Sequence, residues 1–437
     1  MADPGTMPAM IDLGPFPDEP GYDHALSLDE DDPLGAQRDH YVIAEPDLIY
    51  LDGNSLGRLP RETAHLLARV VDEQWGQRLI RSWNDGWWDL QLRLGDKLAG
   101  IVGAGPGEVI ISDSTSINLY KLALAVIEAA PRGRDRIVTD DMNFPTDVYI
   151  LDGVARQTGA ELVVVPVDHE TDPAESVIQA LDDRTALVSL SHTTFKSGYT
   201  YDMVALTRAA HDAGALVIWD CSHSVGVVPI DLEGCGADLA IGCTYKYLNG
   251  GPGSPAWLYV RSELQETLSN PITGWWGHVD PFAFDLGFSP VPGIRRFHSG
   301  TMPILSLAAI EPGLDEVMTV GLEAIRAKSL ALSDFLIELA DGELAPLGLE
   351  LASPRRPERR GSHVSLSHQD AWLVTRGMIE GAKVIPDFRT PDNIRLGLAP
   401  LYTSFLDLHT AVQRIKRLVA GRGYQQYAGD TATATVT

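Results

Sequence analysis

Between about residues 60 and 310, short apolar runs alternate with segments of helical periodicity, and this pattern constrains the fold more than any other feature. The apolar or β-branched runs are 108–112, 136–140, 161–167, 186–191, 215–220 and 237–243. Helical periodicity covers 115–130, 176–184 and 202–214. Continuously apolar runs suit strands that helices bury on both faces, so the alternation predicts an α/β fold with a parallel, doubly wound sheet.

After about residue 311 the pattern changes. Long helical segments are followed by two strand-like stretches, 361–368 and 393–400. This predicts a smaller α+β domain at the C-terminal end. A chain of 437 residues is long enough to form a large core and a second domain.

The charge balance excludes one class of partner. The chain has 34 Lys and Arg against 60 Asp and Glu, a net charge of −26. Binding a nucleic acid needs clustered basic residues, so we expect no nucleic-acid partner. One basic cluster occurs, "RRPERRG" at 355–361, and we interpret it as a solvated loop.

Cysteine usage and hydropathy indicate the compartment. The three cysteines, Cys221, Cys235 and Cys243, form no CxxC pair, which favours a reducing, cytoplasmic setting. No apolar run approaches the roughly 18 residues of a membrane helix, and the N-terminus lacks the pattern of a signal peptide. We expect residues 1–20 and 429–437 to be flexible tails.

Polar residues follow five of the predicted strands, directly where each strand ends. In open α/β sheets, ligands bind at the carboxyl ends of the strands. These polar groups are "SDSTSIN" (112–118), "DDMNFPTD" (140–147), "SHTTF" (191–195), "DCSHS" (220–224) and "TYKY" (244–247). Their convergence on one edge predicts a ligand site there.

Three of these groups have complementary chemistry. Hydroxyls at 114–116 open a helix and suit a phosphate, although Ser and Thr also serve there as plain helix caps. Asp220 ends a buried strand and needs a cationic partner, which an arginine could also supply. Lys246, followed by the glycine-rich "NGGPG", suits attack on an aldehyde, or could simply extend to solvent. Pyridoxal 5'-phosphate would satisfy all three groups at once.

Other ligand classes fit less well. The spacings of His192, His223, His278 and His298 match no compact metal motif, so we expect no metal. Neither "GNSLG" nor "NGGPG" gives the dinucleotide fingerprint between a strand and a helix, and a P-loop is missing.

A set of sequence blocks resembles kynureninase, a pyridoxal-phosphate enzyme of the aspartate aminotransferase fold group, over roughly residues 45–425. The blocks occur in the order and spacing of that family, and together they are highly specific. They are "YLDGNSLGRLP", "IRSWNDGWWDL", "DSTSINLYK", "NFPTD", "IWDCSHSVGVVPIDL", "GCTYKYLNGGPGS", "GWWGH", "RGSHVSLSH" and "LAPLYTSF".

The resemblance implies roles for residues around the cofactor. Lys246 matches the Schiff-base lysine and Asp220 the partner of the ring nitrogen. Tyr245 matches a phosphate contact and is also a candidate proton donor. The other implied cofactor contacts are Thr115, Ser116, Phe144, Pro145, Thr146, Asp147, Ser191 and His223 and, supplied by the neighbouring subunit of a homodimer, Trp275 and Thr301.

The resemblance also implies the reaction, hydrolytic cleavage of the Cβ–Cγ bond of L-kynurenine to anthranilate and L-alanine. Arg395 matches the arginine that grips the substrate carboxylate, a task that suits a planar, two-pronged donor. Ser55 and Trp83 look like walls of the substrate pocket. Trp83, Gly300 and Thr301 resemble the bacterial pattern, which favours the unhydroxylated substrate over 3-hydroxykynurenine.

The implied organisation has four parts. Residues 1–60 form an N-terminal segment that packs with the small domain and the active site. Residues 61–310 form the large cofactor-binding domain, 311–427 the small domain, and 428–437 a flexible tail.

The chain departs from the family pattern at a few positions. Thr194 and Phe195 replace an asparagine–tyrosine pair, Cys221 stands where many relatives have an aliphatic residue, and "GWW" replaces a commoner Trp–Phe. Two alternatives remain open. One is another enzyme of the same fold, an aminotransferase or a cysteine desulfurase, although the desulfurase reaction needs a cysteine on a mobile loop. The other is a nucleotide-binding α/β protein without this cofactor.

Overall fold

The computed structural model describes residues 12–167 and 173–429, and the chain divides into two compact units. Unit 1 comprises Met1–Arg58, Lys196–Tyr199 and Glu323–Thr437, and unit 2 comprises Leu59–Phe195 and Thr200–Leu322. Most of the predicted tails, 1–11 and 430–437, lies outside the described residues.

Unit 2 contains a seven-stranded sheet with the order β2-β8-β7-β6-β5-β3-β4 in the described part of the chain. Its strands are β2 (Val109–Ile111), β3 (Arg136–Asp140), β4 (Glu161–Val165), β5 (Thr185–Ser191), β6 (Leu216–Asp220), β7 (Leu239–Gly242) and β8 (Trp257–Val260). From β7 to β4 all neighbours are parallel, whereas β8 is antiparallel to both β2 and β7. The predicted α/β class with a mostly parallel sheet is confirmed.

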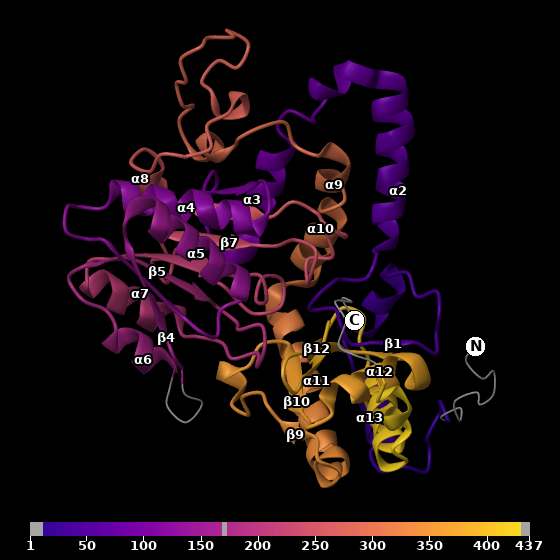
Figure 1. Ribbon diagram of the computed structural model, residues 1–437. Helices are drawn as coiled ribbons and strands as arrows, with labels where there is room; N and C mark the ends of the chain where they lie inside the picture. Colours follow the sequence, from indigo (N-terminus) through magenta and orange to yellow (C-terminus); the bar gives the residue numbers. More distant parts are fainter. Residues whose placement is uncertain (1–11, 168–172, 430–437) are drawn as a thin grey trace. The chain divides into compact units, whose positions relative to one another are not determined.

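Helices surround this sheet because its strands are apolar on both faces. Every residue of β5, β7 and β8 is buried. Figure 1 shows the sheet between α4 with α5 on one side and α6 with α7 on the other. The helices of the unit are α2 (Arg61–Arg69), α3 (Leu90–Val102), α4 (Thr115–Ala129), α5 (Pro145–Thr158), α6 (Pro173–Gln179), α7 (Met203–Asp212), α8 (Ser262–Gln265), α9 (Ile304–Ala308) and α10 (Glu311–Val320).

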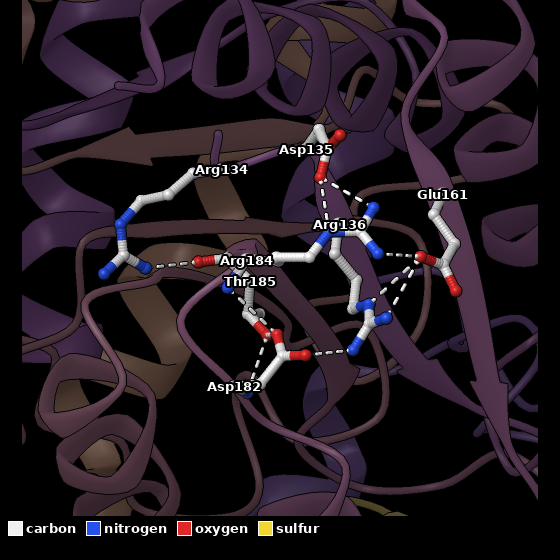
Figure 2. A network of polar contacts seen from close by, with 7 residues as sticks. All are labelled: Arg134, Asp135, Arg136, Glu161, Asp182, Arg184 and Thr185. Carbon is white, nitrogen blue, oxygen red and sulfur yellow. Dashed lines mark hydrogen bonds and ion pairs between the residues drawn. The ribbon is translucent and has the colours of Figure 1, made fainter. Parts of the chain in front are cut away.

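A network of ion pairs lies at the amino ends of β3, β4 and β5, shown in Figure 2. Arg136, at the start of β3, pairs with Glu161 at the start of β4 at 3.1 Å, and also with Asp182. Arg184 pairs with Glu161 and with Asp135, both at 2.9 Å. These charges therefore pair with one another at the amino edge of the sheet.

Unit 1 is an α+β unit with its own core. Its antiparallel sheet has the order β12-β13-β10-β9, and a separate parallel pair joins β1 to β11. Helices pack against these strands around apolar residues that include Leu336, Val364 and Leu408. The elements are α1 (Tyr22–Glu30), α11 (Leu322–Leu339), α12 (Ala371–Ala382), α13 (Phe405–Ala420), β1 (Ile49–Tyr50), β9 (Glu350–Leu351), β10 (His363–Ser367), β11 (Val384–Ile385), β12 (Asp387–Arg389) and β13 (Asn393–Gly397).

Two expectations about surface segments were wrong. Residues 12–20 are anchored rather than free, because Phe16 is buried under the guanidinium of Arg417, 3.7 Å from the ring centre. The basic cluster at 355–361 is not wholly solvated, because Arg360 is buried, pairs with Asp334 and donates to the carbonyl oxygen of Arg355 at 3.0 Å. Among the described helices, none has both the length and the apolarity to cross a membrane.

Candidate active site

The polar strand ends of unit 2 meet at one edge of the sheet, as predicted. Ser191, the last residue of β5, is the partner of Asp220, the last residue of β6, and Asp220 is the partner of Ile241 in β7. Lys246 follows β7 after a short turn. β2 runs in the same direction as these strands, because β8 is antiparallel to both β2 and β7. The start of α4 therefore lies at this edge too.

Two buried carboxyl groups form a pair at this edge. Asp147, in the first turn of α5, hydrogen-bonds the side chain of Asp220. Burial raises the pKa of Asp147 well above its usual range, and the charge of Asp220 and the bond between the two raise it further. Asp147 therefore keeps its proton and donates it to Asp220. The Asp220 carboxylate also accepts from the backbone N–H of Ser222 at 2.8 Å.

A cation lies close to this acid pair. Lys246 Nζ is 2.8 Å from Nε2 of His223, a buried side chain on the turn after β6. The charge of Lys246 acts on Asp147 in the direction opposite to burial, by favouring the ionised carboxylate. One electrostatic cluster therefore comprises Lys246, His223, Asp147 and Asp220. Asp220 ends β6 and His223 lies on the turn after it, whereas Asp147 comes from the start of α5 and Lys246 from the turn after β7.

The first turn of α4 has the chemistry of an anion site. Ser114 caps the helix by accepting from the backbone N–H of Ile117 at 3.4 Å. Thr115 and Ser116 are half-buried in the first turn, so their hydroxyls remain accessible. The N–H groups at a helix start and its positive dipole end both favour a phosphate.

An exposed aromatic ring begins α5. Phe144 is the residue before Pro145 and is 43% exposed, which is unusual for a phenylalanine between buried strands. Its ring meets the edge of Phe195 at 5.3 Å between centroids. Phe195 belongs to one of the departures from the family pattern, the Thr194–Phe195 pair, and it packs on the ring that is predicted to cover the cofactor. Pro145 is exposed and Thr146 half-buried beside it.

Tyr245 keeps a protonated hydroxyl, which can donate a hydrogen bond. The charge of Cys243 and burial raise the pKa of its phenol, so the hydroxyl keeps its proton. The thiols of Cys221 and Cys243 are fully buried, and burial raises the pKa of both. A buried, protonated thiol is a poor nucleophile.

Two residues that sequence reasoning missed organise this edge. Asn143 bridges two strands, because its Nδ2 donates to Thr139 Oγ1 on β3 at 2.5 Å and its Oδ1 accepts from the backbone N–H of Ser191 on β5 at 2.5 Å. Asp140 accepts from the hydroxyl of Tyr201 at 2.5 Å, and burial raises its pKa to about 6. The available signal was a pair of amide and acid side chains directly after a buried strand.

Unit 1 carries a separate polar cluster around Arg395. This buried side chain on β13 pairs with Asp387 on β12, and its Nη2 donates to Ser55 Oγ at 2.9 Å. Ser55 in turn donates to Asp387 at 3.1 Å, and Arg389 pairs with the same carboxylate at 2.7 Å. Two guanidinium groups thus share Asp387, and a second buried carboxyl group, Asp52, acts on the same cluster; burial and the charge of Asp387 raise its pKa to about 6.

The aromatic residues predicted at the site form a cluster of their own in unit 2. Trp88 stacks on Trp276 at 4.3 Å, and Trp83 meets Trp276 at 5.3 Å. Trp275 packs against Trp88 but is 42% exposed, and Thr301 is also exposed.

The donors at the carboxyl edge fit pyridoxal 5'-phosphate. The buried acid pair calls for a cationic hydrogen-bond donor, which a protonated pyridine supplies. Lys246 supplies the amine, Phe144 a flat apolar surface, and the start of α4 the phosphate site. The described residues contain no group of three or more His, Cys, Asp or Glu that could hold a metal ion.

Comparisons with known proteins agree with this chemistry. The family described as "Kynureninase C-terminal domain" matches residues 325–415. The chain is 44% identical over 401 residues to a kynureninase from Burkholderia pseudomallei (strain K96243), which covers 91% of this chain and 95% of that one. It is 45% identical over 407 residues to the kynureninase of Pseudomonas fluorescens, covering 92% and 96%.

Solved structures share the fold at low identity. A cysteine desulfurase from Thermococcus onnurineus NA1 superposes with a TM-score of 0.74 at 20% identity, covering 91% of this chain and 98% of that chain. The cysteine desulfurase CsdA from Escherichia coli gives a TM-score of 0.76 at 16% identity, covering 89% and 98%. At these identities the likeness concerns the fold alone.

Proposed function

Because the chain belongs to the kynureninase family, we propose that it cleaves the Cβ–Cγ bond of L-kynurenine by hydrolysis, with pyridoxal 5'-phosphate as cofactor, and that the residues above divide this work as follows. The observation that carries the proposal is the high identity over nearly the whole chain. It is supported by the buried acid pair and the nearby lysine at the carboxyl edge of the sheet.

Lys246 and His223 handle protons. Lys246 would hold the cofactor through its amine, and its Nζ would take the Cα proton of the substrate. His223, 2.8 Å from this nitrogen, orients the amine. When bound, the cofactor supplies an electron sink that stabilises negative charge on the adjacent substrate carbons.

Asp220 and Asp147 hold the pyridine nitrogen. Burial and the neighbouring Asp220 favour the protonated form of Asp147, and in this proposal Asp220 carries the negative charge of the pair. Asp220 would accept the N–H of a protonated pyridine and so maintain its charge. Thr115 and Ser116 would bind the phosphate, with Tyr245 as a further donor. The proposed cofactor site also includes Pro145 and Thr146, which precede Asp147 in α5, and Ser191, the strand partner of Asp220.

Arg395 binds the substrate carboxylate in this proposal, with Ser55 beside it. We expect Arg395→Ala to raise KM for L-kynurenine by about 10–100-fold, because a hydrogen bond to a charged group contributes about 1.5–3 kcal/mol. Steady-state kinetics of anthranilate release measures this. The matched control is Arg389→Ala, which removes the other guanidinium from Asp387. An unchanged KM in Arg395→Ala, or an equal rise in the control, contradicts the assignment.

The substrate preference is tested with both candidate substrates. We expect kcat/KM to be higher for L-kynurenine than for 3-hydroxykynurenine, because Trp83, Gly300 and Thr301 resemble the bacterial pattern. The assay compares the two at matched concentrations with purified holoenzyme. The proposed reaction is contradicted if the enzyme releases neither anthranilate nor 3-hydroxyanthranilate and instead transfers an amino group to a keto acid or releases sulfide from cysteine.

We also propose a homodimer in which Trp275 and Thr301 reach the neighbouring active site. Support comes from large apolar side chains that unit 2 exposes: Trp75, Leu79, Ile80, Phe282, Phe284 and Leu286. Phe282 packs on Trp88 and Trp275, so this surface adjoins Trp275. Exposed apolar groups of this size mark interaction surfaces. Sedimentation velocity tests the state, and a monomer at micromolar concentration contradicts it.

The remaining assignments follow from the family. We place the reaction in tryptophan catabolism, in the kynurenine pathway that leads to NAD biosynthesis. A cytoplasmic location is supported by three free cysteines. Unit 2 would be the cofactor-binding domain, and unit 1 the small domain with the N-terminal segment.

A further inference from the structure

Asp113 has an unusual backbone conformation just before the first turn of α4. It lies between β2 and the cap of α4, and its φ of 48° falls in the left-handed region. Residues with a side chain rarely adopt this region unless the surroundings hold them there. Asp113 directly precedes Ser114, so its conformation sets the direction in which the first turn of α4 presents Thr115 and Ser116.

A buried lysine holds the Asp113 side chain. Lys121 is fully buried, two turns into α4, and its Nζ lies 2.8 Å from Asp113 Oδ2 and 2.8 Å from the carbonyl oxygen of Phe297. Burial favours the neutral form of Asp113, but the charge and the hydrogen bond of Lys121, together with the hydrogen bond from Ser112, outweigh it and lower the pKa of the carboxyl. Ser112 Oγ donates to the same Oδ2 at 2.9 Å.

The neighbouring histidine leaves this ion pair undisturbed. His298 Nδ1 lies 3.3 Å from Ser112 Oγ, and burial together with the charge of Lys121 lowers its pKa to about 3. His298 is therefore neutral at physiological pH. Because a buried ammonium needs a charged partner, the position of Lys121 requires Asp113 to stay in place.

We propose that Lys121 is a positioning residue for the cofactor phosphate, acting through Asp113. By holding Asp113 in its left-handed conformation, Lys121 fixes the turn from which α4 presents its first N–H groups and hydroxyls. This inference rests on the proposed function, since it takes the phosphate as the ligand of this turn. Nζ of Lys121 contacts Asp113 and the Phe297 carbonyl, so its effect on the ligand is indirect.

The test compares two buried lysines in the full-length protein. Lys121→Met and Lys328→Met each break a buried Lys–Asp pair, the second being Lys328 with Asp32 at 2.6 Å in unit 1. Both variants are expected to melt at a lower temperature than the wild type. Titration of each apoenzyme with pyridoxal 5'-phosphate should show Kd raised about tenfold or more, about 1.4 kcal/mol, in Lys121→Met only. An equal Kd in both variants overturns the inference.

A second pair of variants isolates the backbone effect. Lys121→Met/Asp113→Gly and Lys121→Met/Asp113→Ala both lack the two charges and differ only in how readily position 113 becomes left-handed. The glycine variant should bind the cofactor at least about threefold more tightly than the alanine variant. Equal affinities contradict the proposed role of the turn, and this comparison holds even if Lys121→Met alone folds poorly.

A ligand without phosphate distinguishes a failure of this inference from a failure of the proposed function. Pyridoxal should bind Lys121→Met as well as it binds the wild type, because only the phosphate site is altered. An equal loss for pyridoxal and its phosphate overturns the inference while the proposed function stands. A wild-type apoenzyme that binds no pyridoxal 5'-phosphate instead overturns the proposed function.

Discussion

Replacing Lys246 by alanine is expected to abolish anthranilate release, with kcat lowered by at least about 10³-fold. The variant loses the amine that attaches the cofactor and removes the Cα proton, and proton transfer by a positioned side chain alone contributes about 10²–10⁴-fold. His223, at 2.8 Å from Nζ, would remain but has no amine to orient. The measurements are kcat under saturating cofactor and the mass of peptides after borohydride reduction.

The control for this variant is Lys97→Ala, which removes another lysine of unit 2, paired with Glu311 and Asp315 on α10. It should keep its activity and its borohydride label at Lys246. Two results contradict the assignment: turnover of the Lys246→Ala variant near the wild-type rate, or a reduced cofactor found on a different lysine of the wild-type protein.

The second large effect is expected for Asp220. Asp220→Asn should lower kcat by about 10²–10³-fold, because it removes a preorganised charge from a buried site. Asp147→Asn should lower kcat by only about tenfold or less, because burial and Asp220 already favour the protonated form of Asp147 and the amide keeps a hydrogen-bond donor toward Asp220. Single-turnover kinetics of the two variants under saturating cofactor measures this difference.

The difference in kcat between the Asp220→Asn and Asp147→Asn variants is what tests the proposed roles. Both side chains are buried in one cluster and both substitutions are nearly isosteric, so a purely structural role would give similar losses. If Asp147→Asn is as inactive as Asp220→Asn, the negative charge is not located on Asp220 as proposed. Binding of the cofactor should be measured for each variant so that a loss of occupancy is separated from a loss of rate.

Much of unit 2 was predictable because its signals are local. The run 215–220 is apolar except for its last residue, and the run 136–140 is β-branched at its three central positions. The structure has β3 at Arg136–Asp140 and β6 at Leu216–Asp220. β8 was missed because it returns antiparallel to β7 through a glycine-rich loop, whereas the sequence pattern predicted a parallel sheet. The N-terminal anchor at Phe16 was missed because its partner, Arg417, lies at the other end of the chain.

The alternation of apolar runs and helical segments was enough to predict a parallel sheet, and therefore to predict that Lys246, Asp220 and the start of α4 share one edge. It could not indicate that Asp147 keeps a proton against Asp220, that Arg395 shares Asp387 with Arg389, or that Lys121 holds Asp113. Periodicity is a property of neighbouring residues. Protonation and ion pairing depend on burial and on distances between elements far apart in the chain, so only the tertiary structure decides them.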